Sequence, residues 1–415
     1  MCQTVSRHPL ITIDIAMSNT TAVQSFKLST GGLFYTLLLK ARIIEEDKYH
    51  ARRLILLFIG ITWLILLILS AIEGGLYEAG VGISFLTDIN PHVRYLIVAP
   101  ILLMAGQIID PLVAGVIQHL KTSGLIPNNN HAEYSTAVDN LARRRDSTGA
   151  DIVIIIFALG VSWLALPGYG ETTELGKVST WLWTTDGKSL SVTPAGWWYI
   201  LVAAPLSQVL LYRWFWRFLI WIGFLYRVSQ IRLALLPTHG DLTGGLSILA
   251  NGQFAFVVVF FAFGALLSSG VAHEMLVDGS TLKEMQPVIY GFVAISVVAM
   301  VAPLLLFTQD LVNAKRHGRR EYGALGYRLS NAFDKKWNQE EAPMEQGKEI
   351  LTAVDPSALA DYNAIYETVS GMHAFPMKIR TIALLAVILY VPFAPLILIE
   401  IPFEEVLSRL LNTLA

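Results

Sequence analysis

One stretch between two long apolar segments combines residue types that can do chemistry. It reads LLPTHGDLTGGLSIL and covers residues 235–249. His239 and Asp241 could bind a metal ion or relay a proton, although two ligands alone make no metal site. Amides exposed by Gly244 and Gly245 at the start of a helix suit an anion or a carboxylate. The simpler interpretation is structural: Asp241 and Thr243 cap the next helix, and the glycines allow a tight turn.

Three charged residues lie inside otherwise apolar segments: Asp110, Arg213 and Arg217. In the middle of a membrane helix each charge costs about 2.5–3.5 kcal/mol, so such residues pair, reach the interface or line a water-filled cavity. We expect Asp110 and Arg213 to lie at similar depth and to pair, with Arg217 one turn further along the same helical face. Two interpretations stay open. The cluster either fixes helix packing, with the arginines reaching headgroups, or forms an anion or proton site.

The elements that position these residues follow from the composition. Hydrophobic residues make up 54% of the 415 residues, charged residues only 15%, and the mean hydropathy is +0.54. A soluble domain rarely has this composition. The net charge of −2 gives no reason to expect a nucleic acid partner. The single cysteine, Cys2, cannot form an internal disulfide, and the N-terminal residues lack the pattern of a cleaved secretory signal.

Seven apolar segments are candidates to cross a membrane, since about 20 helical residues span the hydrocarbon layer. The shortest of the seven covers residues 152–166, and Asp151 makes its extension costly. The sequence therefore predicts an all-α fold: a polytopic transmembrane helical bundle of about seven spans with amphipathic cytoplasmic helices. The segments are residues 54–72, 95–117, 152–166, 195–226, 254–271, 288–307 and 379–399.

The charges of the connecting segments predict the topology. With seven spans, the segments on the side of the N-terminus hold 23 of the 30 lysines and arginines, and the opposite segments hold five. We call the first the basic side. Because basic loops stay in the cytoplasm, we expect a cytoplasmic N-terminus and a C-terminus outside. Tryptophans are expected to mark both interfaces of the fourth span: Trp181, Trp183, Trp197 and Trp198 outside, and Trp214, Trp216 and Trp221 inside.

Four regions are predicted along the chain: a cytoplasmic N-terminal segment with an interfacial helix (1–53), a six-span membrane core (54–307), a cytoplasmic helical insert (308–378), and the last span with a short external tail (379–415). The fourth span is too long for one crossing, so it must tilt or emerge on the basic side. In the insert, the sixth span is expected to continue as an amphipathic helix, followed by a second helix from Asp355. We expect the two to pack together or on the bundle.

The order of three motifs resembles a family of bacterial polytopic inner-membrane proteins with no assigned activity. LPTHGDLTGGLSIL is similar to its HPD-x-AGGL-type stretch, although Gly240 stands where that pattern has proline. RREYGALGYRLSNAFDKKW resembles its YG…F..KW segment, and DPSALADYNAIYETVSGMHAFP resembles its closing D-x-x-SLAD region. The resemblance begins near Gly32 and implies a location in the bacterial inner membrane, with no mechanism.

Three classes of function are considered. A transporter or channel for a small anionic or proton-coupled solute comes first, and its cytoplasm-facing cavity would have Asp110, Arg213 and Arg217 as its floor. His239, Asp241, Gly244 and Gly245 would form the lip of this cavity. A non-catalytic scaffold or sensor acting through the cytoplasmic helices comes second. An enzyme comes last, because no nucleophile or metal motif is present. The expected partners are the bilayer, a small anion or proton, and a protein or second copy of the chain. The sequence specifies no cofactor.

Overall fold

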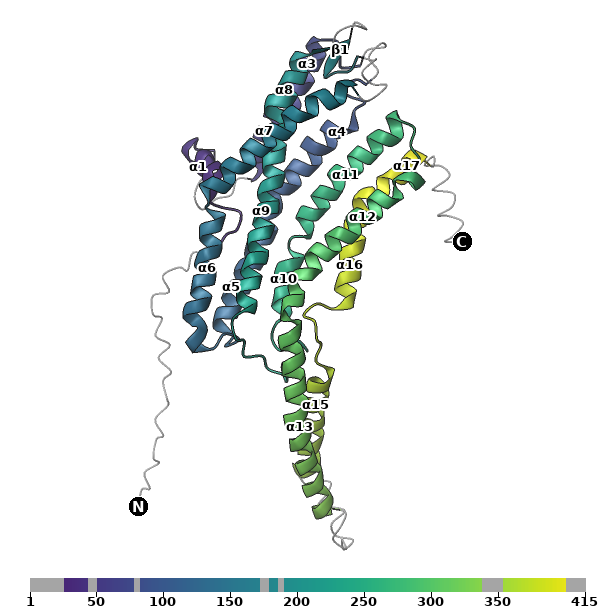
Figure 1. Ribbon diagram of the computed structural model, residues 1–415. Helices are drawn as coiled ribbons and strands as arrows, with labels where there is room; N and C mark the ends of the chain where they lie inside the picture. Colours follow the sequence, from purple (N-terminus) through teal and green to yellow (C-terminus); the bar gives the residue numbers. More distant parts are fainter. Residues whose placement is uncertain are drawn as a thin grey trace, which may run out of the picture.

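The computed structural model describes residues 26–43, 51–77, 83–171, 179–185, 190–337 and 354–400, and gives the backbone alone at 165–171 and 190. Within these ranges, seven helical runs are long and apolar enough to cross a membrane, and the two named strands form one small pair. The expected all-α bundle of seven spans is therefore confirmed. Figure 1 shows the runs side by side, with a helical hairpin projecting from one end.

The first four runs are all longer than their apolar segments, because the helix continues past the apolar residues at one end or at both. The first run, Ala51–Ile72, consists of α2 (Ala51–Ile59), a π-helical stretch (Gly60–Leu64) and α3 (Ile65–Ile72), and the second, Ile89–Thr122, of α4 (Ile89–His92), a π-helical stretch (Val93–Val98) and α5 (Ala99–Thr122). The third, Asn128–Leu164, begins with a 3₁₀ turn (Asn128–Asn130) and continues through α6 (His131–Arg145) into α7 (Thr148–Glu171). The fourth, Pro194–Ser229, consists of α8 (Pro194–Trp198), a π-helical stretch (Tyr199–Ala203) and α9 (Ala204–Ser229). Strands β1 (Trp183–Thr185) and β2 (Leu190–Val192) precede α8 and pair antiparallel.

The last three runs are interrupted as well, two of them at prolines. They are Ser247–Val277 (α10 Ser247–Phe254, α11 Val257–Val277), Leu282–Trp337 (α12 Leu282–Val301, 3₁₀ Ala302–Phe307, α13 Thr308–Trp337) and Ile379–Glu400 (α16 Ile379–Tyr390, 3₁₀ Val391–Leu396, α17 Ile397–Glu400). Pro303, Pro392 and Pro395 lie in the two tightened stretches. Proline lacks an N–H and cannot continue the α-helical ladder, which explains the local change of pitch.

The third span is longer than its apolar segment suggested. Helix α7 runs for 24 residues from Thr148, which corresponds to about 36 Å and is enough to cross. Asp151 lies in its first turn, where the helix dipole favours a negative charge. The residue that was expected to limit the span therefore lies inside its helix.

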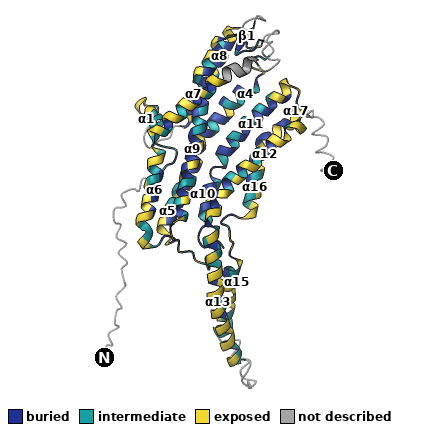
Figure 2. Cartoon of the chain, viewed as in Figure 1, coloured by how far each residue is buried: buried dark blue, intermediate teal, exposed yellow. Residues whose placement is uncertain are grey.

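The core of the bundle runs along α5, α9 and α11. Figure 2 shows buried residues on these three helices, whereas α7, α12 and α16 carry more exposed residues, as expected of faces that meet lipid. The first run, which contains α2, is also mostly exposed. Trp214 and Trp221 are almost fully buried in this core, so their prediction as interface residues is wrong. Their ring N–H groups explain why: Trp214 donates to the carbonyl of Leu102 and Trp221 to Gln253 Oε1.

Two helices form the projecting hairpin. Helix α13 continues the sixth span, and α15 (Val354–Gly371) returns beside it (Figure 1). Tyr362 donates a hydrogen bond to the carbonyl of Tyr322, and its ring lies against Gly326, whose missing side chain permits the approach. Lys336 and Asp355 pair near the far end. The prediction of two amphipathic helices that pack together is thus confirmed.

Candidate functional site

The seven predicted site residues fall into two groups. Asp110 on α5 and Arg213 and Arg217 on α9 lie around residues 26–33, which we call the N-terminal strap. His239, Asp241, Gly244 and Gly245 lie in the loop between α9 and α10. The strap leads into α1 (Gly32–Lys40), the predicted interfacial helix.

Two aspartates hold the amides of the strap. Asp110 Oδ1 accepts from the Ser29 amide at 2.8 Å, and its other oxygen accepts from the Ser29 hydroxyl. Asp151 Oδ2 accepts from the Leu33 amide at 2.5 Å. Leu28, the strap residue before Ser29, is fully buried in the core of the bundle. Hydrogen bonds to an ionised carboxylate are stronger than neutral ones, so these contacts fix the strap firmly.

Three arginines hold the carbonyls of the same strap. Arg213 Nη2 donates to the Gly31 carbonyl at 2.8 Å, Arg217 donates to the Ser29 carbonyl, and Arg145 Nη1 donates to the Lys27 carbonyl at 2.8 Å. Arg213 and Arg217 are buried, with 6% and 8% of their surface exposed. Side chains of the second, third and fourth helical runs therefore all bind the backbone of the strap through hydrogen bonds. Among the strap side chains, Leu28 packs in the core and the Phe26 ring lies beneath Arg145.

The expected ion pair has a different partner. Arg213 was predicted to pair with Asp110, but its Nε lies 3.4 Å from Asp151 Oδ1, and both side chains are buried. Asp110 instead binds Ser29, and Arg217 is the cation that interacts with it electrostatically. The prediction failed because Asp151 was placed outside the third span. Since α7 begins at Thr148, the carboxylate of Asp151 faces α9 rather than the loop.

A glycine of the strap explains the close fit. Gly32 has φ +80°, a left-handed backbone that residues with a side chain rarely adopt, and a Cβ there would overlap the Asp151 carboxylate. On the facing helix, a Cβ at Gly106 would come within 2.6 Å of Ser29 Cβ. The sequence analysis missed Ser29, Gly32, Arg145 and Asp151 as members of this cluster. The run STGG just before an apolar helix was the signal that could have indicated them.

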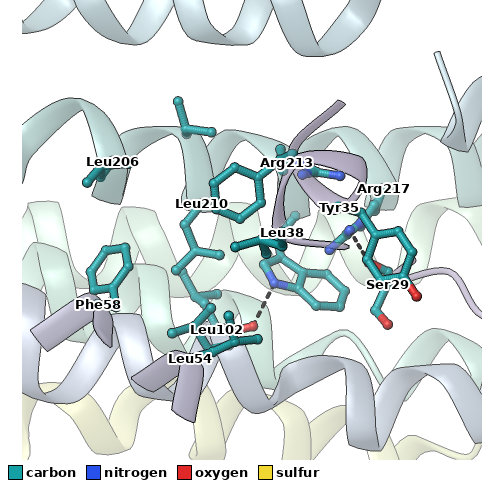
Figure 3. A pocket seen from close by; sticks show the side chains of 14 residues that line it. Ser29, Tyr35, Leu38, Leu54, Phe58, Leu102, Leu206, Leu210, Arg213 and Arg217 are labelled. Atoms are coloured by element: carbon teal, nitrogen blue, oxygen red, sulfur yellow. Dashed lines mark hydrogen bonds between the residues drawn. The ribbon is translucent and has the colours of Figure 1, made fainter. Parts of the chain in front are cut away.

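Beside the strap lies a narrow cavity of about 60 Å³ between α1, α2, α5 and α9. Figure 3 shows Arg213, Arg217, Ser29 and Tyr35 at one end, and Leu206 and Phe58 at the other. Both arginines line this cavity, whereas neither Asp110 nor Asp151 does. Most of the remaining wall is apolar. The cavity is thus polar and positive at one end and hydrophobic along the rest.

A second, wider cavity of about 1730 Å³ lies on the other side of the strap, between α1, the end of α5, and α6. It is open, and many of the side chains that line it are polar. Lys27, Lys121, Arg145, Asp139 and Asp146 are among the residues that line it, so charges of both signs face its interior. The strap separates this cavity from the apolar one.

Asp241 organises the loop before α10. Its carboxylate accepts hydrogen bonds from the amide and hydroxyl of Thr243, from the Gly245 amide at 3.1 Å and from the Ser247 amide at 3.2 Å, the last at the start of the helix. Burial alone would raise the pKa of Asp241, but these hydrogen bonds outweigh it and hold the pKa well below its usual value. The capping interpretation is correct for Asp241, whereas Thr243 binds Asp241 instead of the helix.

The loop packs against other elements of the basic side. The Leu242 carbonyl accepts from the His373 amide at 2.6 Å, and a Cβ at Gly245 would come within 2.9 Å of Leu125. Gly244 and Gly245 have φ of +63° and +98°, so both glycines are required by the turn. Neither of the two cavities is lined by the four loop residues. Their role in binding a ligand stays a prediction.

Among the residues that the structure describes, no three His, Cys, Asp or Glu side chains gather closely enough to hold a metal ion. Comparison of the chain with family models, curated proteins and solved structures finds no match. The functional argument therefore depends on the geometry of the cluster around the strap.

Proposed function

We propose that this integral membrane protein is a transporter or channel for a small anionic or proton-coupled solute, with Arg213, Arg217 and Asp110 as its binding residues. The observation that carries the proposal is a cluster of four charged residues around a backbone segment inside the bundle: Asp151, Arg213 and Arg217 are buried, and Asp110 is half-buried. Charges this deep in a membrane protein usually mark a solute or proton pathway. Their partners on the strap are mainly backbone groups, and in this proposal the strap leaves as one unit during transport and exposes them.

In this proposal the structure corresponds to a closed state, with the strap between the arginines and the wide polar cavity. A solute would enter through that cavity from the cytoplasm. The location in a bacterial inner membrane and the cytoplasmic N-terminus belong to the same proposal, supported by the motif resemblance and the excess of positive charge on the basic side. Reporter fusions after Arg145 and Ala415 are expected to read cytoplasmic and external.

Reconstitution into liposomes tests the proposal. Efflux of chloride, phosphate and small carboxylates, and proton movement, would be followed for the native chain and for Arg217→Gln. We expect flux of at least one of these species, reduced at least tenfold in the variant. Arg227→Gln is the matched control, since it removes one positive charge from the last turn of the same helix. Absence of flux for every species, or equal flux in Arg217→Gln, would overturn the proposal.

A second candidate is a scaffold or sensor that acts through the α13–α15 hairpin. The hairpin carries apolar side chains that its own packing leaves open: Tyr327 is 75% exposed and Ile365 43%. Scattered exposed apolar residues are ordinary on a surface, so this observation is weaker than the buried charges. If the hairpin is the functional element, Tyr327→Glu with Ile365→Glu abolishes function while Arg217→Gln leaves it unchanged, the reverse of the pattern expected for transport.

A further inference from the structure

The narrow cavity beside the strap has the shape and the polarity of an amphiphile. Its length follows α9 from Leu206 to Arg217, which corresponds to about 16 Å, or roughly half of the 30 Å hydrocarbon layer. A lipid chain of one leaflet spans the same depth. Its apolar end is formed by Leu206, Leu210 and Phe58, and its positive end by Arg213 and Arg217 (Figure 3).

The volume limits what the cavity admits. A water-sized group needs about 10–15 Å³ measured in the same way, so about 60 Å³ corresponds to a single file of a few groups. The slot therefore admits about four to six groups of one flexible chain, so a long chain occupies it only in part, and a bulky solute does not fit. The polar end is then the only place where a headgroup finds partners.

The charge on the wall selects the headgroup. Arg213 and Arg217 both face the cavity, while the carboxylates that balance them, Asp151 and Asp110, lie outside its lining. An anion in the cavity therefore meets the two guanidinium groups first, whereas Asp151 lies behind Arg213 at 3.4 Å from its Nε. Guanidinium groups bind carboxylate and phosphate oxygens with charge-assisted hydrogen bonds, and the apolar surroundings strengthen that interaction.

Lipid lies close to this cavity. Helices α1 and α2 form one wall, and each turns exposed leucines away from it: Leu37 is 53% exposed and Leu57 45%. A wall one helix thick separates the cavity from the surrounding acyl chains. An amphiphile of the leaflet on the basic side could enter between these helices with its chain parallel to its neighbours and its headgroup at the level of the arginines.

We infer that this cavity binds a single-chain anionic amphiphile, an acyl or similar chain with a carboxylate or phosphate head. The chain lies along Leu206 and Leu210, and the head lies against Arg213 and Arg217. The inference goes beyond the proposed function and shares with it only the two arginines. Binding is measurable without transport, so the two fail separately.

Photolabelling of the full chain tests this inference. The protein is placed in nanodiscs of zwitterionic phosphatidylcholine, labelled with a palmitate that carries a diazirine near its chain end, and mapped by peptide mass spectrometry. We expect adducts on α9 near Leu206 and on α2 near Phe58. Unlabelled palmitate or hexadecyl phosphate should reduce the labelling at least tenfold, and whichever competes better identifies the head. Hexadecanol and acetate should not compete.

Two variants separate the site from the lipid-facing surface. Leu210→Trp fills the slot and should reduce labelling at least tenfold, whereas Leu219→Trp on the exposed face of the same helix should leave it unchanged. Arg217→Gln should reduce the labelling to a similar extent. If this variant does not fold, Leu210→Trp and the headgroup competition still test whether the cavity binds the amphiphile. Competition by hexadecanol equal to that by palmitate, or unchanged labelling in Leu210→Trp, would overturn the inference. Labelling without solute flux would instead leave the amphiphile site standing and remove the transport proposal.

Discussion

At the scale of single residues, the buried pair Arg213–Asp151 is the contact that the sequence did not indicate. Removing one partner of a buried pair leaves the other charge without compensation, which costs about 3–5 kcal/mol. Both groups also hold the strap, through the Gly31 carbonyl and the Leu33 amide. The pair therefore couples the third and fourth spans to the N-terminal segment.

A double-mutant cycle tests this pairing. Asp151→Asn should lower the thermal stability of the purified protein, and adding Arg213→Gln should restore part of it, with a coupling of about 0.5–3 kcal/mol. A second cycle with Asp110→Asn and Arg213→Gln is the comparison. There the loss of stability in the double variant should be closer to the sum of the losses in the two single variants. Equal coupling energies in the two cycles would contradict the specific pairing of Arg213 with Asp151 and favour the Asp110–Arg213 pair predicted from the sequence.

The loop aspartate gives a pH prediction. Because the folded pKa of Asp241 lies below its unfolded value of about 3.9, its contribution is complete above about pH 4 and is lost as the pH falls through the folded pKa. Asp241→Asn should therefore lower stability by about 1–3 kcal/mol at pH 7, and the difference from the native chain should shrink in acid. Thermal unfolding from pH 3 to 7 measures this. Asp361→Asn, at an exposed carboxylate of α15, serves as the control, because His239 itself lies 2.8 Å from Asp241. A constant difference between Asp241→Asn and the native chain across that range would contradict the account.

At the scale of elements, the α13–α15 hairpin depends on one close approach. A Cβ at Gly326 would overlap the Tyr362 ring, whereas a Cβ at Gly323, one turn away, would meet Tyr366 only at 3.9 Å. In a helix interior, glycine to alanine gains about 0.8–1.0 kcal/mol from propensity alone. Gly323→Ala should therefore protect the hairpin against protease, and Gly326→Ala should make it more susceptible. The same response in both variants would mean that the helices do not pack through Gly326.

Periodicity and hydropathy predicted the elements well, and the reasons for the errors are specific. The spans and the hairpin follow from apolar segments and a 3.6-residue stripe, which are local signals. The prediction for Trp214 was wrong because an aromatic side chain at the end of a span can face either lipid or the core of the bundle. Which of the two it faces depends on the helices packed against it, and these are not evident from a local sequence pattern. The strap could not be predicted because its contacts join Ser29 to Asp110 and Leu33 to Asp151, residues far apart in sequence.

At the scale of the whole molecule, the account makes the N-terminal strap the element that closes a charged site inside the bundle. Charged side chains of the second, third and fourth spans form hydrogen bonds with the backbone of the strap in addition to their contacts with one another: Asp110 with the Ser29 amide, Asp151 with the Leu33 amide and Arg213 with the Gly31 carbonyl. The state of the strap therefore determines whether the arginines are accessible from the basic side. This is the central claim, and it concerns one segment that can be probed directly.

The direct test is the reactivity of a cysteine in the strap. In a Cys2→Ser background, Leu28→Cys replaces a fully buried side chain, and Lys27→Cys replaces a partly exposed neighbour on the wide cavity. In membrane vesicles the account predicts slow maleimide labelling of Leu28→Cys, fast labelling of Lys27→Cys, and fast labelling of Leu28→Cys once Gly32→Ala displaces the strap from Asp151. Labelling of Leu28→Cys as fast as that of Lys27→Cys, in a chain that is inserted and stable without Gly32→Ala, would contradict the account.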